Sequence, residues 1–197
     1  MVRRKAAGTL RALATGRSAH SGSAPDQGAN ALLALAHAAI EVARLHEPQG
    51  PDRLSVVPTV VRSGQAFNVV PADGELIFDM RADTSDAFAR VVAGVPERVD
   101  GVTVEARLER VWPGMDSRAV TQSLLERASE RLGRRILGVA RGGASDASHF
   151  APSIPLTVDG LGPRGGGAHT PEEFVLAPSL GERAEVAMAI ALEALES

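Results

Sequence analysis

The chain has 197 residues, 44% of them hydrophobic, and a net charge of −3 at pH 7, so it can form one large or two small packed domains. The acidic balance argues against a nucleic-acid-binding surface, and no stretch approaches the roughly 18 consecutive apolar residues that a membrane span needs. Because cysteine is absent, disulfides and cysteine nucleophiles are excluded, and any metal must be held by histidines and carboxylates.

The first half of the sequence alternates strand and helix patterns in the order β-α-β-β-α-β. The basic start, MVRRKAAGTLRALATG, lacks the apolar core and cleavage site of a signal peptide, which predicts a strand and a cytoplasmic protein. Period-two alternation predicts strands, and apolar residues at helical spacing predict helices. The strands are expected at 8–15, 54–64, 74–83 and 102–110, and the helices at about 31–45 and 84–95. This order is that of the ferredoxin-like, split β-α-β arrangement.

The first helix is expected to bury the face formed by Leu32, Ala36, Ala39 and Ala43, and this face is widened by Leu33, Leu35 and Ile40. Ser23 with Asp26 fits a capping box ahead of it. In the strand at 74–83, Leu76, Phe78 and Met80 are expected to face the core.

The composition shifts after residue 113, which predicts a boundary between domains at 1–113 and 114–197. A helix is predicted at 117–132, stopped by Gly133, and a second at about 178–196. Strand-like segments lie between them at 134–140 and 154–160. About 85 residues with this content make a small core on their own, so the second segment is interpreted as part of a larger α/β domain.

The candidate functional residues each have an ordinary structural alternative. His20 and His169 lie in glycine-rich loops, where histidine can be a metal ligand, an acid or base, or a surface residue. Arg81 can grip a substrate carboxylate or pair with Asp79 on the same strand face. Asn68 precedes a turn, where asparagine is often only a turn former.

Three segments together are more specific than any single residue. GRSAHSGSAPDQGANALLALA (16–36), GQAFNVVPADGELIFDMR (64–81) and GGASDASHFAPSIPLTVDGLGPRGGGAHTPEEFV (142–175) resemble, in this order, motifs of the dinuclear-zinc carboxypeptidase/aminoacylase family. That family includes glutamate carboxypeptidase, acetylornithine deacetylase and succinyl-diaminopimelate desuccinylase, and the glutamate-carboxypeptidase-like branch is the most similar. The resemblance runs from about residue 5 to residue 197.

The resemblance implies a ferredoxin-like lid that forms a homodimer, followed by the C-terminal part of an α/β zinc-peptidase catalytic domain. It implies that His20 reaches the active site of the partner subunit and stabilises the tetrahedral oxyanion. It also implies hydrolysis of an amide bond beside a free carboxylate, in a small acyl-amino acid or peptide, by water that bridges two zinc ions. The implied substrate contacts are Asn68, Arg81, Gly142, Gly143 and Ser145, and the implied metal ligand is His169.

The sequence departs from the family in its metal ligands. The family's His-x-Asp is absent from this chain, and the single Glu-Glu, Glu172–Glu173, follows His169 instead of preceding the lid. A two-metal site needs ligands for both ions and a base, which His169 alone does not provide. We therefore expect the chain to be inactive by itself. The alternatives are a non-catalytic dimerisation module, one half of a split enzyme completed by a separate N-terminal catalytic half, or a truncated product with a poorly folded second segment.

Overall fold

The computed structural model describes residues 1–196 and divides the chain into two compact units. One unit is Lys5–Gly114, and the other combines Met1–Arg4 with Met115–Ser197. The role of 1–113 as a lid and the role of 114–197 as part of a catalytic domain stay predictions. Among residues 1–196, no helix is both long and apolar enough to span a lipid bilayer, and the cytoplasmic location also stays a prediction.

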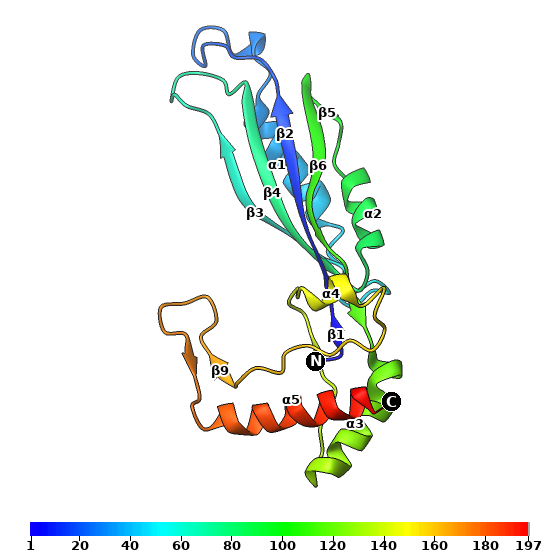
Figure 1. Cartoon of the computed structure of the whole chain (residues 1–197). Coiled ribbons are helices and arrows are strands. Elements are labelled where there is room, and N and C mark those ends of the chain that lie inside the picture. The colour runs from blue at the N-terminus through cyan, green and yellow to red at the C-terminus, as the bar shows by residue number, and fades with distance from the viewer. Residues whose placement is uncertain (197) are drawn as a thin grey trace. The chain divides into compact units, whose positions relative to one another are not determined.

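The Lys5–Gly114 unit is a five-stranded antiparallel sheet covered by two helices (Figure 1). The sheet order is β3-β4-β2-β6-β5. Along the chain, α1 connects β2 to β3, and α2 lies between β4 and β5. The bounds are β2 Ala6–Thr15, α1 Ala31–Ala43, β3 Ser55–Ser63, β4 Asp73–Ala82, α2 Phe88–Ala93, β5 Arg98–Val99 and β6 Val102–Trp112, with short 3₁₀ helices at Pro25–Gln27 and Ser85–Ala87. The predicted ferredoxin-like fold is confirmed.

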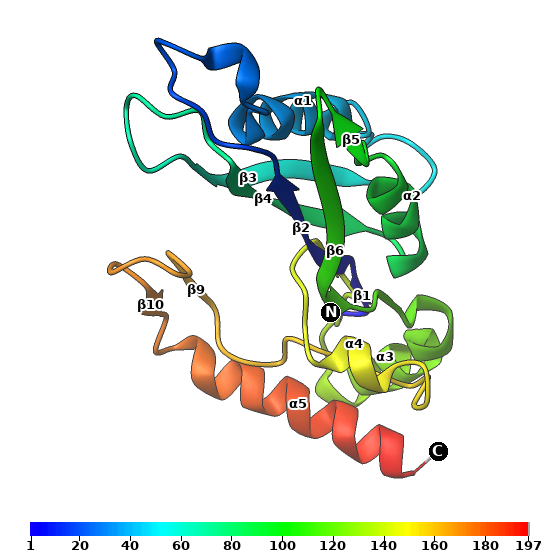
Figure 2. The same cartoon turned by 90° about the horizontal axis from the view of Figure 1, so that it is seen from above.

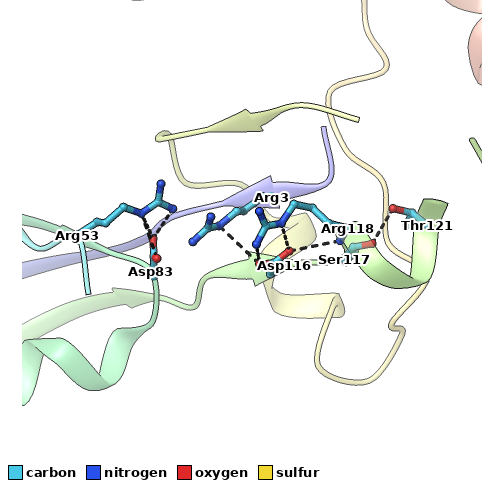
Figure 3. Close-up of polar contacts among 7 residues, drawn as sticks. All are labelled: Arg3, Arg53, Asp83, Asp116, Ser117, Arg118 and Thr121. Atoms are coloured by element: carbon cyan, nitrogen blue, oxygen red, sulfur yellow. Dashed lines mark hydrogen bonds and ion pairs between the residues drawn. The ribbon is translucent and has the colours of Figure 1, made fainter. Parts of the chain in front are cut away.

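The core of this unit lies between one face of the sheet and the helices (Figure 2). Leu76, Phe78 and Met80 point into it from β4, as the alternation predicts, and Leu10 joins them from β2. α1 and α2 contribute alanine, leucine, valine and phenylalanine side chains to the same cluster. An ion pair between Arg53 and Asp83, with an Nη2–Oδ1 distance of 2.6 Å, ties the loop before β3 to the end of β4 (Figure 3).

The start of α1 differs from the predicted capping box. The cap is Asn30, whose Oδ1 accepts hydrogen bonds from the backbone N–H groups of Leu32 and Leu33 at 3.0 and 3.3 Å. The capping box predicted at Ser23 is wrong, because Pro25–Gln27 forms a separate 3₁₀ turn that no side chain caps. Asparagine at this position satisfies the N–H groups that the first helical turn leaves unpaired.

The buried face of α1 is also rotated from the expected one. Leu35 is buried as expected, together with Ala31, Ala34, Ala38 and Val42. Leu32 and Ile40 stay 41% and 59% exposed. The apolar stripe of α1 is wider than the strip that the sheet covers. The helix therefore carries an apolar flank that its own unit leaves open.

The other unit combines helices with short strands. The bounds are β1 Arg3–Arg4, β7 Met115–Asp116, α3 Arg118–Leu132, β8 Ala140–Arg141, α4 Ala147–Phe150, β9 Gly165–Gly166, β10 Phe174–Val175 and α5 Ser179–Leu195. β1 lies between β7 and β8, and β9 pairs with β10. α3 and α5 pack together through leucine, alanine, valine and isoleucine side chains.

Both helices predicted in this unit are confirmed, but its strands are shorter than predicted. The segment 134–140 contributes only Ala140 to a strand, and 154–160 forms none. Thr157 donates hydrogen bonds to Ile154 and Pro155 instead, which folds that segment into a local turn. Proline at 155 removes a donor that a strand would use.

The ends of α3 are well defined. Gly133 stops the helix in the left-handed conformation, with φ +63°, which favours glycine. At the other end, Asp116 accepts hydrogen bonds from the Arg118 guanidinium at 2.7 and 2.8 Å and lies 3.6 Å from Arg3 Nε (Figure 3). The buried Thr121 hydroxyl donates to the Ser117 carbonyl at 2.6 Å, as the same figure shows.

Candidate functional site

His20 and Asn68 lie side by side at one end of the Lys5–Gly114 unit. His20 follows β2, and Asn68 lies in the loop between β3 and β4. A backbone bridge pairs His20 with Val69, flanked by hydrogen bonds from Ser21 N to Asn68 O at 3.0 Å and from Val70 N to Ala19 O at 2.9 Å. The two loops thus form a small two-stranded ladder that places two predicted site residues next to each other.

The ring of His20 is held by its own loop. The backbone N–H groups of Gly22 and Ser23 both donate to His20 Nδ1 at 3.1 Å. A nitrogen that accepts these bonds carries no proton, so the neutral ring has its proton on Nε2. Because the side chain is exposed, the loop presents an imidazole N–H donor away from its own backbone.

The loop that carries Asn68 also carries a fully exposed aromatic residue. Phe67 has a relative exposure of 101%, and Asn68 is exposed as well. Nothing in the sequence pattern distinguished Phe67 from a core residue, because a phenylalanine close to two valines, Val69 and Val70, is typical of buried segments.

Arg81 lies towards the other end of the sheet. Its Nε and Nη2 donate to the two carboxylate oxygens of Asp79 at 3.0 and 2.9 Å, which is the surface pairing that the sequence left open as an alternative. Arg81 lies eight residue steps along β4 from Asp73 at the Asn68 end, which corresponds to roughly 26 Å. Within one unit, Arg81 and Asn68 do not converge on one ligand.

The loop that contains Gly142, Gly143 and Ser145 lies in the other unit and is held by Arg4 and Asp159. Arg4 donates to the Gly143 carbonyl at 3.4 Å and to Asp159 Oδ2 at 2.7 Å. Partial burial raises the pKa of Asp159, but hydrogen bonds from Ser145, Arg4 and Gly160 outweigh burial and hold that pKa below its ordinary value. Arg4 and Asp159 were not among the candidate residues, since no sequence signal joins positions 155 residues apart.

His169 lies in the loop between β9 and β10, with an unusual backbone. Its backbone φ is +67°, in the left-handed region that residues other than glycine rarely adopt. The backbone N–H of His169 donates a hydrogen bond to Glu173 Oε2 at 3.4 Å. The ring is exposed. The glycines before it have a local role, because a Cβ on Gly165 would collide with the carbonyl oxygen of Phe174 in the paired strand.

The residues around His169 do not fit a dinuclear metal centre. Among the residues that the structure describes, no group of three or more His, Asp or Glu side chains is placed to hold a metal ion. A zinc site needs three or four such ligands. His169 is therefore at most one ligand of a site whose other ligands lie elsewhere.

The ferredoxin-like unit also matches a known family. The peptidase dimerisation domain family matches residues 2–107, which is more than half of the chain. The chain belongs to this family. The proteins that it resembles include a carboxypeptidase and related hydrolases, which confirms the resemblance drawn from the three segments.

Two relatives show how far the likeness extends. Carboxypeptidase G2 from Pseudomonas sp. (strain RS-16) is 24% identical over 165 residues, which cover 79% of this chain and 39% of the relative. Indole-3-acetyl-aspartic acid hydrolase from Enterobacter agglomerans is 38% identical over 104 residues, which cover 49% of this chain and 23% of the relative. The chain thus spans less than half the length of these relatives.

Solved structures share the fold over nearly the whole chain. Aminopeptidase PepT from Bacillus cereus aligns with a TM-score of 0.79 and 24% identity, over 98% of this chain and 53% of its own. The YXEP protein of Bacillus subtilis, described as a dinuclear metal binding peptidase from the M20 family, aligns with a TM-score of 0.70 and 16% identity, over 98% of this chain and 51% of its own. At these identities the likeness establishes the fold.

Proposed function

We propose that this chain supplies the dimerisation lid and the C-terminal part of the catalytic domain of a zinc-dependent carboxypeptidase or aminoacylase. The reaction is hydrolysis of an amide bond beside a free carboxylate. The observation that carries the proposal is the geometry of His20, whose exposed ring is held by its own loop with Nε2 as the donor. The names of carboxypeptidase G2 and the indole-3-acetyl-aspartic acid hydrolase support this class of substrate.

The role of His20 follows from the charge that develops during amide hydrolysis. When water adds to the carbonyl carbon, the carbonyl oxygen gains negative charge, and a preorganised N–H donor stabilises it. The bonds from Gly22 and Ser23 fix the ring before the substrate arrives, so no reorientation is needed during reaction. In this proposal the donor serves the active site of the partner subunit.

The remaining contacts are assigned to substrate binding. The amide of Asn68 and the loop of Gly142, Gly143 and Ser145 are proposed to bind the scissile region, and Arg81 is proposed to bind the carboxylate. Because Arg81 and Asn68 lie at opposite ends of the sheet in one unit, the two residues that contact one substrate would have to come from different subunits. Arg81 already forms a two-pronged pair with Asp79, the geometry by which a guanidinium binds a substrate carboxylate. Substrate would have to replace Asp79 in that pair.

The metal centre is proposed to be completed outside these residues. His169 would be one zinc ligand, and the other ligands and the base would come from a segment that carries His-x-Asp and Glu-Glu. The described residues provide no cluster able to hold two ions. We therefore assign these residues no reaction step that depends on a bound metal. The 197-residue chain by itself is therefore proposed to be inactive.

The homodimer is proposed to form through an apolar groove between α1 and β3, named here the α1–β3 groove. It has a volume of about 280 Å³ and is lined by Leu32, Leu35, Ala36, Ala39, Pro58, Thr59, Val60, Val61 and Leu76. β3 is the edge strand of the sheet, with β4 as its single neighbour in the described structure. An edge strand beside an open apolar helix flank is suited to pairing with a second copy of itself.

Hydrolysis of N-acyl-glutamate and N-acyl-aspartate, with zinc present, tests the proposal. The chain is assayed alone and mixed with a polypeptide from the same genome that carries His-x-Asp and Glu-Glu. Activity is expected only in the mixture, and His20→Ala should lower kcat there by about 10²- to 10³-fold. His37→Ala, an exposed histidine on α1, is the control. Turnover by the chain alone would overturn its proposed inactivity, and full activity of the His20 variant would overturn the role of His20.

The competing proposal is a non-catalytic dimerisation module. The observation that favours it is the α1–β3 groove, which supports association without any chemistry. It predicts a stable dimer, and no hydrolysis in any mixture.

A further inference from the structure

Four arginines converge on one small pocket of the unit that contains α3 and α5. Arg134 and Arg135 follow the end of α3, Arg164 precedes β9, and Arg183 lies in α5. The pocket has a volume of about 150 Å³, and Ile136, Leu137, Glu182 and Val186 complete its lining. None of these residues belongs to the proposed hydrolytic site.

The arginine side chains are only partly neutralised. Arg134 pairs with Glu185 at 2.8 Å, and Arg164 lies 3.5 Å from Glu182. Arg183 donates to the backbone carbonyls of Gly160 and Gly162 at 2.7 and 3.0 Å, which orients its guanidinium without cancelling its charge.

Arg135 is exposed, and within residues 1–196 the structure shows no carboxylate paired with it. The pocket is therefore lined by four arginines and one carboxylate, Glu182, and a second carboxylate, Glu185, pairs with Arg134.

The backbone that carries these arginines is fixed. Gly133 turns the chain at the end of α3, Arg134 N donates to Ser129 O at 3.2 Å, and Ile136 N donates to Ser129 Oγ at 2.9 Å. On the other side, Arg164 N donates to Ser179 Oγ at 2.9 Å. A ligand that binds here therefore loses little free energy to ordering the backbone.

We propose that this pocket binds a small oxyanion, as free phosphate or as a carboxylate group of a di- or tricarboxylic acid. Planar guanidinium groups bind both kinds of anion through paired N–H donors. Arg135 and Arg164 provide the main contacts, because their side chains are the least engaged. The site is separate from the proposed amide hydrolysis.

Calorimetric titration of the full chain tests the proposal, in a buffer free of phosphate and carboxylates. Phosphate, citrate and chloride are titrated at the same ionic strength. Saturable binding of phosphate or citrate, and not of chloride, is expected, and the stronger of the two identifies the source. The double variant Arg135→Gln/Arg164→Gln should bind at least about tenfold more weakly.

Arg98→Gln is the control, because Arg98 is an exposed arginine of the other unit and the change makes the same Arg→Gln substitution away from the pocket. Arg135→Lys keeps the charge but loses the paired donors, and an intermediate affinity is expected for it. Circular dichroism confirms that each variant is folded. Absence of saturable binding, unchanged affinity of the double variant, or equal loss in Arg98→Gln would each overturn the proposal.

Discussion

Truncating two side chains of the α1–β3 groove should dissociate the proposed homodimer. Leu32 and Val61 are 41% and 56% exposed, so together they leave about one whole apolar side chain uncovered in each protomer. Burying a side chain of this size contributes about 1.5–3 kcal/mol. A symmetric dimer buries both copies, so Leu32→Ala/Val61→Ala should cost about 3–6 kcal/mol, or about 10²- to 10⁴-fold in the dimer dissociation constant.

Sedimentation equilibrium over a range of protein concentrations measures this change. Leu108→Ala is the control, because Leu108 lies on β6, outside the groove, and is 42% exposed. The truncated side chains are largely exposed, so the fold of the monomer should survive, which circular dichroism can verify. A dissociation constant unchanged by the double variant, or lowered affinity in the Leu108 variant alone, would refute the assignment of the groove.

Three further predictions concern stability. Asn30→Ala should destabilise the Lys5–Gly114 unit by about 1 kcal/mol in urea unfolding, because it removes the helix cap, whereas Ser23→Ala should change little; equal effects would contradict the cap assignment. Gly8→Ala should cost about 1–3 kcal/mol in the same assay, since its Cβ would lie 2.9 Å from Met80 Cε and Phe88 Cε2 in the core, and a neutral effect would show that the core has spare room. Hydrogen bonds from Arg131 and Arg127 to Glu193 lower the pKa of that carboxyl below 4.5, so its stabilising contribution is complete above that pH and is lost as the pH falls through the folded-state value. Thermal unfolding from pH 7 to 3 should show a smaller loss in Glu193→Gln than in the wild-type chain, and identical profiles would exclude this contribution.

The ferredoxin-like unit could be predicted because its signals are local. Leu76, Phe78 and Met80 alternate with polar residues along one strand, and that alternation alone indicates which face is buried. The order of strands and helices then leaves few topologies.

The orientation of α1 could not be predicted, because its apolar stripe is wider than the part that the sheet covers. Leu32, Ala36 and Ala39 have the composition of core residues but line the α1–β3 groove. A sequence pattern separates apolar from polar faces, but it does not tell a face that packs inside the unit from one left open.

The groups that orient the candidate site residues could not be predicted from the sequence, for a different reason. Arg4 and Asp159 meet across 155 positions, and the hydrogen bonds to His20 Nδ1 come from backbone groups that any residue provides. The motifs indicated His20 and Ser145, but not the contacts that orient them.

A measurement of the tautomer of the His20 ring tests the central claim most directly. Long-range ¹H–¹⁵N correlation spectra of the ¹⁵N-labelled chain above pH 7, with His20→Gln used to assign the signals, show which ring nitrogen carries the proton. The account predicts that Nδ1 is unprotonated and Nε2 bears the hydrogen, because Gly22 and Ser23 donate to Nδ1. A proton on Nδ1, or rapid averaging of the two forms, would contradict the preorganised donor on which the proposed function rests.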